Sequence, residues 1–234
     1  MRLNLDTTLT SPALPSIRLV PYTADHVFQY HTWMEDEDLR AATGSERLSA
    51  AQEAAMQAAW AQEGDKLSFI ILDACALADA ERAGVPRRQA ELAAMVGDVN
   101  LFMQAASSDG EDGGAPITPL AMGEVEIMVA APAARGKGMG AAAVRLLLTY
   151  ARAHLGLARV VAKVGRTNMT SLALFTSRLG FVVVKEVAVF DEVHLRADFP
   201  DLDVGAGSAE VHPALVGVVE EGAYGAWLDG EEDA

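Results

Sequence analysis

The sequence predicts a mixed α/β (α+β) fold, in which helices cover both faces of one central sheet of about six to seven strands. Strand-like and helical segments alternate along residues 123–196, a pattern typical of a sheet covered by helices. A glycine-rich turn near residue 138 joins one of these strands to a helix. Hydrophobic residues make up 51% of the 234 residues, which is enough to build a core.

Apolar runs in the N-terminal half predict three strands, at residues 16–21, 66–73 and 95–103. One helix is expected to follow a cap at Thr23 or Asp25, and a second to follow Ser49. Residues 74–92 are rich in alanine and charge, which indicates a surface insertion with room for a short helix. Residues 107–119 are rich in glycine and aspartate and are expected to form a flexible connection.

The C-terminal half predicts four strands, at residues 123–129, 159–164, 181–185 and 188–196. A helix is expected to open near Gly138 and to carry an apolar stripe that ends at Leu155. A second helix is expected to begin at Asn168 and to stop at Gly180.

The formal net charge of −15 is concentrated at one end of the chain. Residues 198–234 hold ten acidic residues and no Lys or Arg, so residues 1–197 carry only −5. We therefore expect one folded domain over residues 1–197 and an acidic, disordered tail over residues 198–234. The acidity argues against nucleic acid and against anionic membrane surfaces as partners, because both attract basic proteins.

The chain carries no pattern for secretion or membrane insertion. Cys75 is the only cysteine, which excludes an intrachain disulfide and favours a reducing compartment. No apolar leader opens the sequence, and the longest apolar runs fall far short of a membrane span. We expect a cytoplasmic protein, with a nuclear location left open.

The strongest chemical signal is the turn Arg135, Gly136, Lys137, Gly138, Met139 and Gly140. Alternating glycines let the backbone approach a ligand closely, and the following helix presents its positive end. The turn therefore predicts a phosphate or pyrophosphate site, with Arg135 and Lys137 as counter-charges; a flexible helix-capping turn is the plainer alternative. A Walker loop is excluded because Gly138 follows the lysine. A dinucleotide fingerprint would need an acidic residue closing the next strand, and residues 160–166 have none.

The pattern Arg-x-x-Gly-x-Gly over Arg135–Gly140 resembles that of the GCN5-related N-acetyltransferase (GNAT) superfamily. The stretch from Asn168 through Ser171 and Phe175 to Leu179, Gly180 and Phe181 is similar to the second cofactor segment of that family. The resemblance implies a GNAT fold that binds acetyl-CoA as cosubstrate, without a metal. It implies contacts with the cofactor by the following residues: Met128, Val129, Ala130, Arg135, Gly136, Lys137, Gly138, Met139, Gly140, Asn168, Ser171 and Phe175.

Stretches within residues 1–197 also resemble the N-acetyltransferase 9-like branch of the family. Among them are residues 20–27, 52–57, 95–102 and 123–129. This resemblance implies acetylation of protein N-termini, with tubulin as the proposed acceptor. Composition and spacing themselves show nothing about tubulin.

Candidates for the catalytic base lie on two of the expected strands. Glu124 and Glu126 are two residues apart and so share one strand face, and Asp98 and Asn100 repeat this pattern on the preceding strand. A carboxylate on a covered strand is costly unless it is paired or functional. Glu126 is the first choice because it lies nearer the cofactor turn, and Glu124 is the second; a structural hydrogen-bond network or a solvated cleft wall is the alternative for all four.

The other signals concern the leaving group and the acceptor. Many GNAT members have a proton-donating tyrosine where Phe175 stands, so the thiolate leaves unprotonated or takes a proton from Tyr150 or water. His31, Trp33 and Met34 are expected to line an acceptor groove with residues 43–48, or else to belong to the core. His26 and His31 lack the spacing of a metal pair.

Three functions remain open at this point. The first is acetyl-CoA-dependent acetylation of protein N-terminal amines. The second is a weakly catalytic or non-catalytic CoA-binding protein that acts through a partner such as microtubules. The third is acetylation of a small amine, because the cofactor half of the sequence does not distinguish acceptors.

Overall fold

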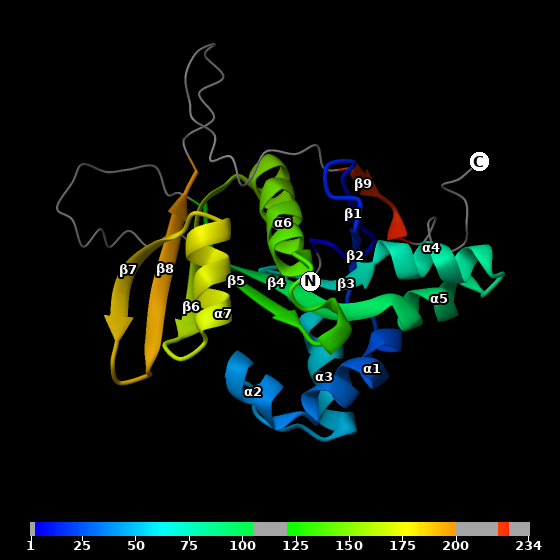
Figure 1. The fold of residues 1–234 in the computed structure, drawn as a ribbon, viewed down its shortest axis with the longest axis horizontal. Coiled ribbons are helices and arrows are strands. Elements are labelled where there is room, and N and C mark those ends of the chain that lie inside the picture. The colour runs from blue at the N-terminus through cyan, green and yellow to red at the C-terminus, as the bar shows by residue number, and fades with distance from the viewer. Residues whose placement is uncertain (1–2, 105–120, 200–219, 225–234) are drawn as a thin grey trace, which may run out of the picture.

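The computed structural model describes residues 3–104, 121–199 and 220–224, which build one mixed sheet with helices on both faces (Figure 1). The sheet has nine strands in the order β7-β8-β6-β5-β4-β3-β2-β1-β9. All neighbouring pairs are antiparallel except β5 and β6, which are parallel. The predicted α/β class is confirmed, and the sheet is wider than the six to seven strands expected.

The strands in chain order are β1 (Thr8–Thr10), β2 (Ile17–Pro21), β3 (Lys66–Asp73), β4 (Met95–Gln104), β5 (Ala121–Val129), β6 (Leu157–Gly165), β7 (Val182–Val187), β8 (Glu192–Asp198) and β9 (Glu220–Gly222). The α-helices are α1 (Val27–Met34), α2 (Glu37–Thr43), α3 (Ala50–Trp60), α4 (Ala74–Arg82), α5 (Arg87–Ala94), α6 (Met139–Leu155) and α7 (Met169–Ala173). Short 3₁₀ turns precede α1 and follow β5, and a π-helical turn, Leu174–Arg178, continues α7.

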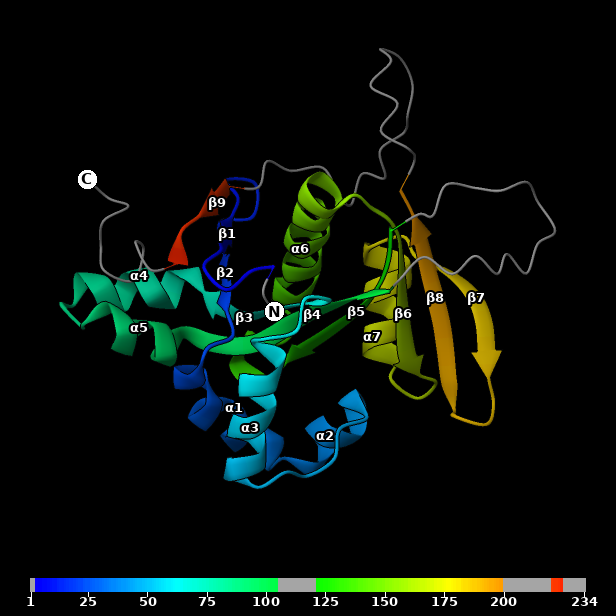
Figure 2. The ribbon, with the colours of Figure 1, turned by 180° about the vertical axis from the view of Figure 1, so that it is seen from behind.

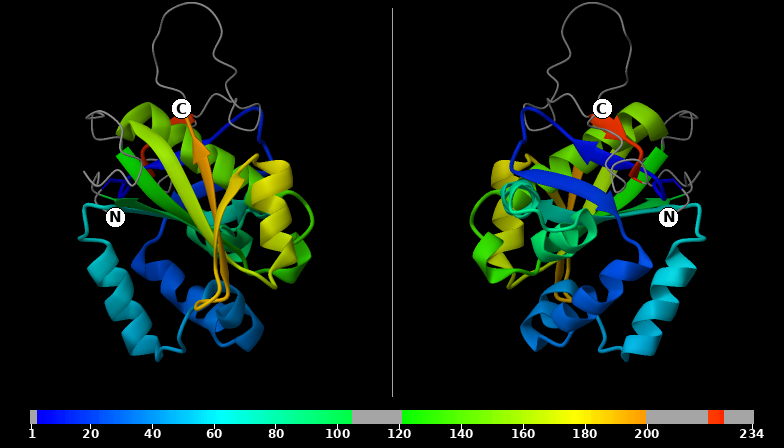
Figure 3. Two further views of the ribbon diagram at one scale, coloured as in Figure 1. Left: turned by 90° about the vertical axis from the view of Figure 1, so that its left-hand side faces the viewer. Right: turned by 90° about the vertical axis from the view of Figure 1, so that its right-hand side faces the viewer.

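The central strands are buried on both faces, so their side chains pack into two separate cores, one on each face of the sheet. On β3, Ile71 packs into the core under α6, whereas its neighbour Ile70 packs into the core under α1, α4 and α5. Figure 3 shows α6 on one side of the sheet and α1–α3 on the other. This double burial explains why residues 66–73 form a continuous apolar run rather than an alternating one.

The two parallel strands separate part-way along their length. Pairing runs from Ala121 with Leu157 to Glu124 with Val161, although β5 continues to Val129 and β6 to Gly165. The second halves of these strands therefore diverge, as Figures 1 and 2 show from opposite sides. A gap between neighbouring strands leaves backbone groups without a sheet partner, and it opens beside the turn that follows β5.

Part of the expected tail belongs to the sheet. Residues 220–222 form β9, which pairs with β1 at the edge opposite β7. Tyr224 is buried in the core under α5, and its hydroxyl donates to Glu91 Oε1 at 2.9 Å. The same carboxylate oxygen contacts His26 Nε2 at 2.6 Å. Residues 220–224 are therefore ordered, whereas a disordered tail was expected from residue 198 onward. The pairing of β9 with the edge of β1 and the burial of Tyr224 hold them in place, and the composition of the tail does not reveal these contacts.

Other elements were missed or mispredicted for similar reasons. The three-residue strand β1 and the helix α2 were not predicted, since neither carries a long periodic pattern. The surface insertion at residues 74–92 is an αα-hairpin of α4 and α5, whose residues Leu77 and Ala90 enter the second core. The flexible connection expected at residues 107–119 lies outside the described residues.

Shortening the chain tests the docked tail. Ending the chain at Phe199 removes β9 and Tyr224, and we expect the free energy of unfolding to fall by about 1–3 kcal/mol, since Glu91 loses a hydrogen-bond donor inside the core. Binding of acetyl-CoA is expected to stay unchanged, because β9 and the strand gap are several strands apart. Urea denaturation and calorimetry measure the two quantities. A chain ending at residue 228 keeps β9 and Tyr224 and is the control; equal stability of the two shortened chains would contradict the docking.

Candidate active site

A cavity of about 780 Å³ lies where β4 and the diverging halves of β5 and β6 face α1, α3 and the loop after α2. Its lining is largely apolar on the helix side, where Met34, Met56 and Trp60 contribute, and polar on the strand side. Five acidic residues line it, namely Glu46, Glu53, Asp98, Glu126 and Glu192. Within the described residues, Lys163 is the only basic residue of the lining. The cavity therefore favours a cationic ligand on its open side.

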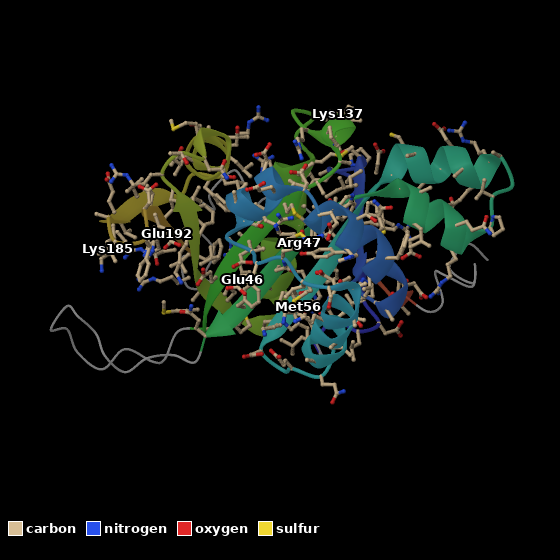
Figure 4. The ribbon with its side chains drawn as sticks, turned by 90° about the horizontal axis from the view of Figure 1, so that it is seen from below. Glu46, Arg47, Met56, Lys137, Lys185 and Glu192 are labelled. Atoms are coloured by element: carbon tan, nitrogen blue, oxygen red, sulfur yellow. The ribbon has the colours of Figure 1, made fainter. Side chains whose placement is uncertain are left out.

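The glycine turn has the backbone that its sequence predicts. Gly136 and Gly138 have φ of 74° and 83°, in the left-handed region that other residues rarely adopt. Gly138 is the N-cap of α6, a helix of 17 residues, so the first N–H groups of the helix have no partner within it. Lys137 is exposed and stands at the outer end of the turn, away from Glu46 and Met56 in Figure 4. The turn can thus hold an anion by backbone N–H groups, with one lysine beside it.

Arg135 binds backbone carbonyls, and its expected role as a counter-charge stays a prediction. Its Nε donates to the carbonyl of Val129 at 3.0 Å and its Nη2 to the carbonyl of Ala130 at 2.9 Å. The guanidinium therefore fixes the free end of β5, next to the gap. Of the predicted cofactor residues on this strand, Met128 lines the cavity, whereas Val129, Ala130 and the glycine turn lie outside its lining.

The second cofactor segment faces the same cavity from the other side of the gap. Asn168 caps α7, its Oδ1 accepting from the Ser171 amide at 3.0 Å, and both residues line the cavity. Phe175 lies in the π-helical turn, is 2% exposed, and packs edge-on against Phe181 with ring centroids 5.0 Å apart. Phe175 also lines the cavity, and its expected contact with the cofactor stays a prediction.

The two predicted bases differ in their surroundings. Glu124 is bound to Lys163 Nζ at 2.7 Å, an ion pair that bridges β5 and β6 where their pairing ends. Glu126 projects from β5 into the cavity. Desolvation and then the charge of Glu124 raise the pKa of Glu126, and Lys163 lowers it. Glu126 is thus the better placed of the two to take a proton, and Glu124 has a structural partner.

Asp98 and Asn100 occupy the same cavity wall, deeper than Glu126. Asp98 is 6% exposed, and Asn100 donates to its Oδ2 at 2.7 Å. Burial is the largest influence on the Asp98 carboxyl and raises its pKa to about 7; the bond from Asn100 lowers this pKa and the charge of Glu126 raises it. A carboxyl with such a pKa exchanges a proton readily at neutral pH.

The helix side of the cavity was only partly predicted. Residues 43–46 and Leu48 line it as expected, and so does Met34, but Trp33 packs in the second core instead. His31 is absent from the lining and its Nδ1 faces Glu53 Oε2 at 3.5 Å. Tyr30, four residues before Met34 on the same face of α1, lines the cavity and was missed. Its spacing from Met34 was the available signal.

The structure does not support Tyr150 as part of the site, and the described residues form no metal site. Tyr150, expected as a proton donor to the leaving thiolate, is a buried residue of α6 that stacks on His154, and it does not line the cavity. The described part of the chain brings no three His, Cys, Asp or Glu residues together as a metal site. None of its helices is long and apolar enough to cross a membrane.

Comparison with known proteins agrees with this geometry. Residues 16–182 match the family described as "Acetyltransferase (GNAT) domain". The chain belongs to this family. It is 42% identical over 197 residues to the human protein named alpha/beta-tubulin-N-acetyltransferase 9, which covers 84% of this chain and 85% of the relative. The Drosophila melanogaster protein of the same name is 43% identical over 180 residues, covering 76% of this chain and 81% of the relative.

The fold comparison gives the same result. The solved structure of spermidine N-acetyltransferase from Vibrio cholerae, in complex with CoA and spermine, covers 78% of this chain and 95% of its own, with a TM-score of 0.60 at 15% identity. The predicted GNAT fold is therefore confirmed, and this GNAT protein is an acetyl-CoA-dependent N-acetyltransferase. Its residues fit the cosubstrate, because the turn before α6 offers free N–H groups and β5 and β6 leave a gap beside it.

Changing Gly138 tests the turn. Gly138→Asp places a carboxylate at the N-cap of α6, and we expect binding of CoA to fall by at least about 100-fold because like charges then meet at the phosphate site. Calorimetry measures the affinity. Gly156→Asp is the matched control, since Gly156 also has a positive φ, of 65°, but caps the far end of the same helix. Equal affinities of the two variants would contradict the assignment of the turn.

The buried carboxyl of Asp98 predicts a pH-dependent effect on stability. Its pKa is about 7 in the folded protein and about 3.9 in the unfolded chain. Between pH 4 and pH 7 the folded state therefore binds the proton more tightly than the unfolded state, and the stability of the wild type falls as the pH rises through this range. Asp98→Asn does not titrate, so its stability relative to wild type should rise from pH 4 to pH 7 by up to about 4 kcal/mol. Urea denaturation at pH 5 and pH 8 measures this difference. A difference independent of pH would contradict the raised pKa.

Proposed function

We propose that this GNAT enzyme acetylates the α-amino groups of protein N-termini, and that tubulin chains are its acceptors. The observation that carries the proposal is the 42% identity, over 84% of the chain, to the human alpha/beta-tubulin-N-acetyltransferase 9. The cavity supports it, since its acidic wall suits a cationic amine and its apolar wall of Met34, Met56 and Trp60 suits a side chain of a peptide.

The reaction needs an activated acetyl group, which acetyl-CoA supplies, and a place for each reacting atom. We assign the turn Arg135–Gly140 to the phosphates and the gap between β5 and β6 to the acyl end. Backbone N–H groups near Met128–Ala130 then stabilise the negative charge that develops on the carbonyl oxygen. Arg135 holds the carbonyls of Val129 and Ala130 and so keeps this stretch of backbone in place.

The acceptor amine must lose a proton before it can attack. At pH 7 roughly 10% of an α-amine with a pKa of about 8 is uncharged, against roughly 0.04% of a lysine side chain. A carboxylate of ordinary base strength therefore suffices to deprotonate an N-terminal amine. The sequence predicts Glu126 as this base, with Glu124 as the second choice. The ion pair of Glu124 with Lys163 favours Glu126 of these two.

Acetyl transfer to peptides tests the proposal. We expect the full chain, incubated with acetyl-CoA, to release free CoA thiol with peptides that begin with tubulin N-termini. The same peptides with a blocked N-terminus are the control and should give background release, even where they contain lysine. Thiol release with polyamines but not with peptides would replace the proposal by small-amine acetylation. Tight CoA binding without release for any amine would replace it by a binding function.

A further inference from the structure

Asp98 stands opposite the stretch of β5 that we assign to the acetyl carbonyl. In the β4–β5 ladder Asp98 pairs with Met128, Asn100 with Glu126 and Phe102 with Glu124. Side chains of directly opposite residues lie about 4.5–5.5 Å apart at Cβ and on the same face. Asp98 is therefore two positions of the ladder nearer to the carbonyl position than Glu126, and four positions nearer than Glu124.

One oxygen of this carboxyl makes no hydrogen bond of normal length, although the Tyr30 hydroxyl lies near enough to lower the pKa of the carboxyl. Asn100 binds Oδ2, whereas Oδ1 is buried and makes no hydrogen bond. The side chain is 6% exposed and lines the cavity. A buried carboxylate oxygen without a donor is costly to folding, so its retention needs a reason. A ligand that donates to Oδ1 from within the cavity supplies one.

The groups around Asp98 leave it without a cation. Glu126 faces it from β5, Tyr30 from α1, and Tyr22 and Glu53 lie near enough to interact with its charge or that of Tyr30. Burial raises the pKa of both tyrosines, which therefore stay neutral at pH 7. Lys163 is bound to Glu124, and His31 to Glu53. The carboxyls around Asp98 thus have no free cation among the described residues beside them, and a substrate ammonium would be the counter-ion of the ionised Asp98 carboxylate.

We propose that Asp98 receives the acceptor amine: its free Oδ1 binds the substrate ammonium and takes one proton from it, and Asn100 is the positioning residue that holds the carboxyl. This inference rests on the proposed function, because it names the group that holds the acceptor. Asp98 thus replaces Glu126 and Glu124, the two bases expected from the sequence, as the group that accepts this proton.

The protons and bonds balance as follows. The ammonium passes one proton to Asp98, which becomes a carboxylic acid, and the neutral amine nitrogen forms a bond to the acetyl carbon. The bond between that carbon and sulfur breaks, and the extra proton on nitrogen leaves with the thiolate sulfur as the CoA thiol. Asp98 finally releases its proton to water. The net products are the acetylated amine, CoA thiol and one proton.

The pH profile of kcat/KM for the amine separates Asp98 from Glu126. If a carboxylate must meet an ammonium, kcat/KM rises as the Asp98 carboxyl ionises, near pH 7, and falls as the free α-amine loses its proton, near pH 8. In Asp98→Asn we expect kcat/KM to drop by about 100-fold or more and to rise steadily with pH, following the uncharged amine alone. In Glu126→Gln the bell shape should persist with less than about a tenfold loss.

A second variant protects this test against misfolding of Asp98→Asn. Asn100→Ala removes the hydrogen bond that favours the ionised carboxyl, so the acid limb of the profile should move to higher pH while binding of CoA is unchanged. An unmoved acid limb in Asn100→Ala, or a bell shape that survives in Asp98→Asn, would overturn the proposal. Loss of the bell shape in Glu126→Gln alone would assign the role to Glu126 instead.

Binding keeps the two proposals distinguishable. Calorimetry of the CoA-loaded full chain with a free-amine peptide, and with a polyamine, should show at least tenfold weaker binding to Asp98→Asn than to wild type. If only the polyamine is bound and acetylated, and its binding depends on Asp98, the proposed N-terminal function fails and the role of Asp98 stands. If peptides are acetylated with equal binding by both proteins, the function stands and the role of Asp98 fails. If wild type binds no amine, both fail.

Discussion

The separation of two parallel strands is the constraint on which the rest of the site depends. β5 and β6 are hydrogen-bonded through Glu124 and Val161 and then diverge, although each strand continues for several residues. An open sheet edge inside a protein leaves backbone groups that need partners. Here Arg135 satisfies two carbonyls at the end of β5, and Lys163 bridges the strands through Glu124 where the gap begins. The diverging part of β5 lines the cavity through Met128, whereas Val129 and Ala130 do not line it.

This constraint also explains why α6 starts where it does. The chain leaves β5, makes the turn through Gly136 and Gly138 with positive φ, and enters a helix packed under the sheet. A Cβ added at Gly140 would be in ordinary contact with Val129, at 3.4 Å, and with Ile127. Packing of the helix on the strand therefore does not require a glycine at position 140. The positive φ of Gly136 and Gly138 explains why those two positions are glycines.

The sequence predicted those parts of the molecule that repeat a pattern over many residues. The boundaries of β3, residues 66–73, and the cap of α7 at Asn168 were predicted correctly, because an apolar run and a capping amide are local signals. The strand β9 and the burial of Tyr224 were not predicted, since both depend on Glu91 and on the edge of β1, which are far away in sequence. The bonds from Arg135 to two carbonyls were not predicted for the same reason: its charge is visible in the sequence, but its carbonyl partners are not.

The acidic character of the protein has a sharper meaning in the cavity than in the chain as a whole. The net charge of −5 over residues 1–197 does not identify a class of substrate. The lining of the cavity is more informative, because it holds several carboxyls and, among the described residues, a single lysine that is itself paired, and so favours a cationic substrate. The charge of Glu126 raises the pKa of Asp98, and the charge of Glu124 raises that of Glu126, so neighbouring carboxyls of the site favour each other's protonated forms. An arriving ammonium reverses this, because it favours the ionised form that then removes its proton. The carboxyl that costs the empty protein stability is the same group that makes the cavity selective for an amine.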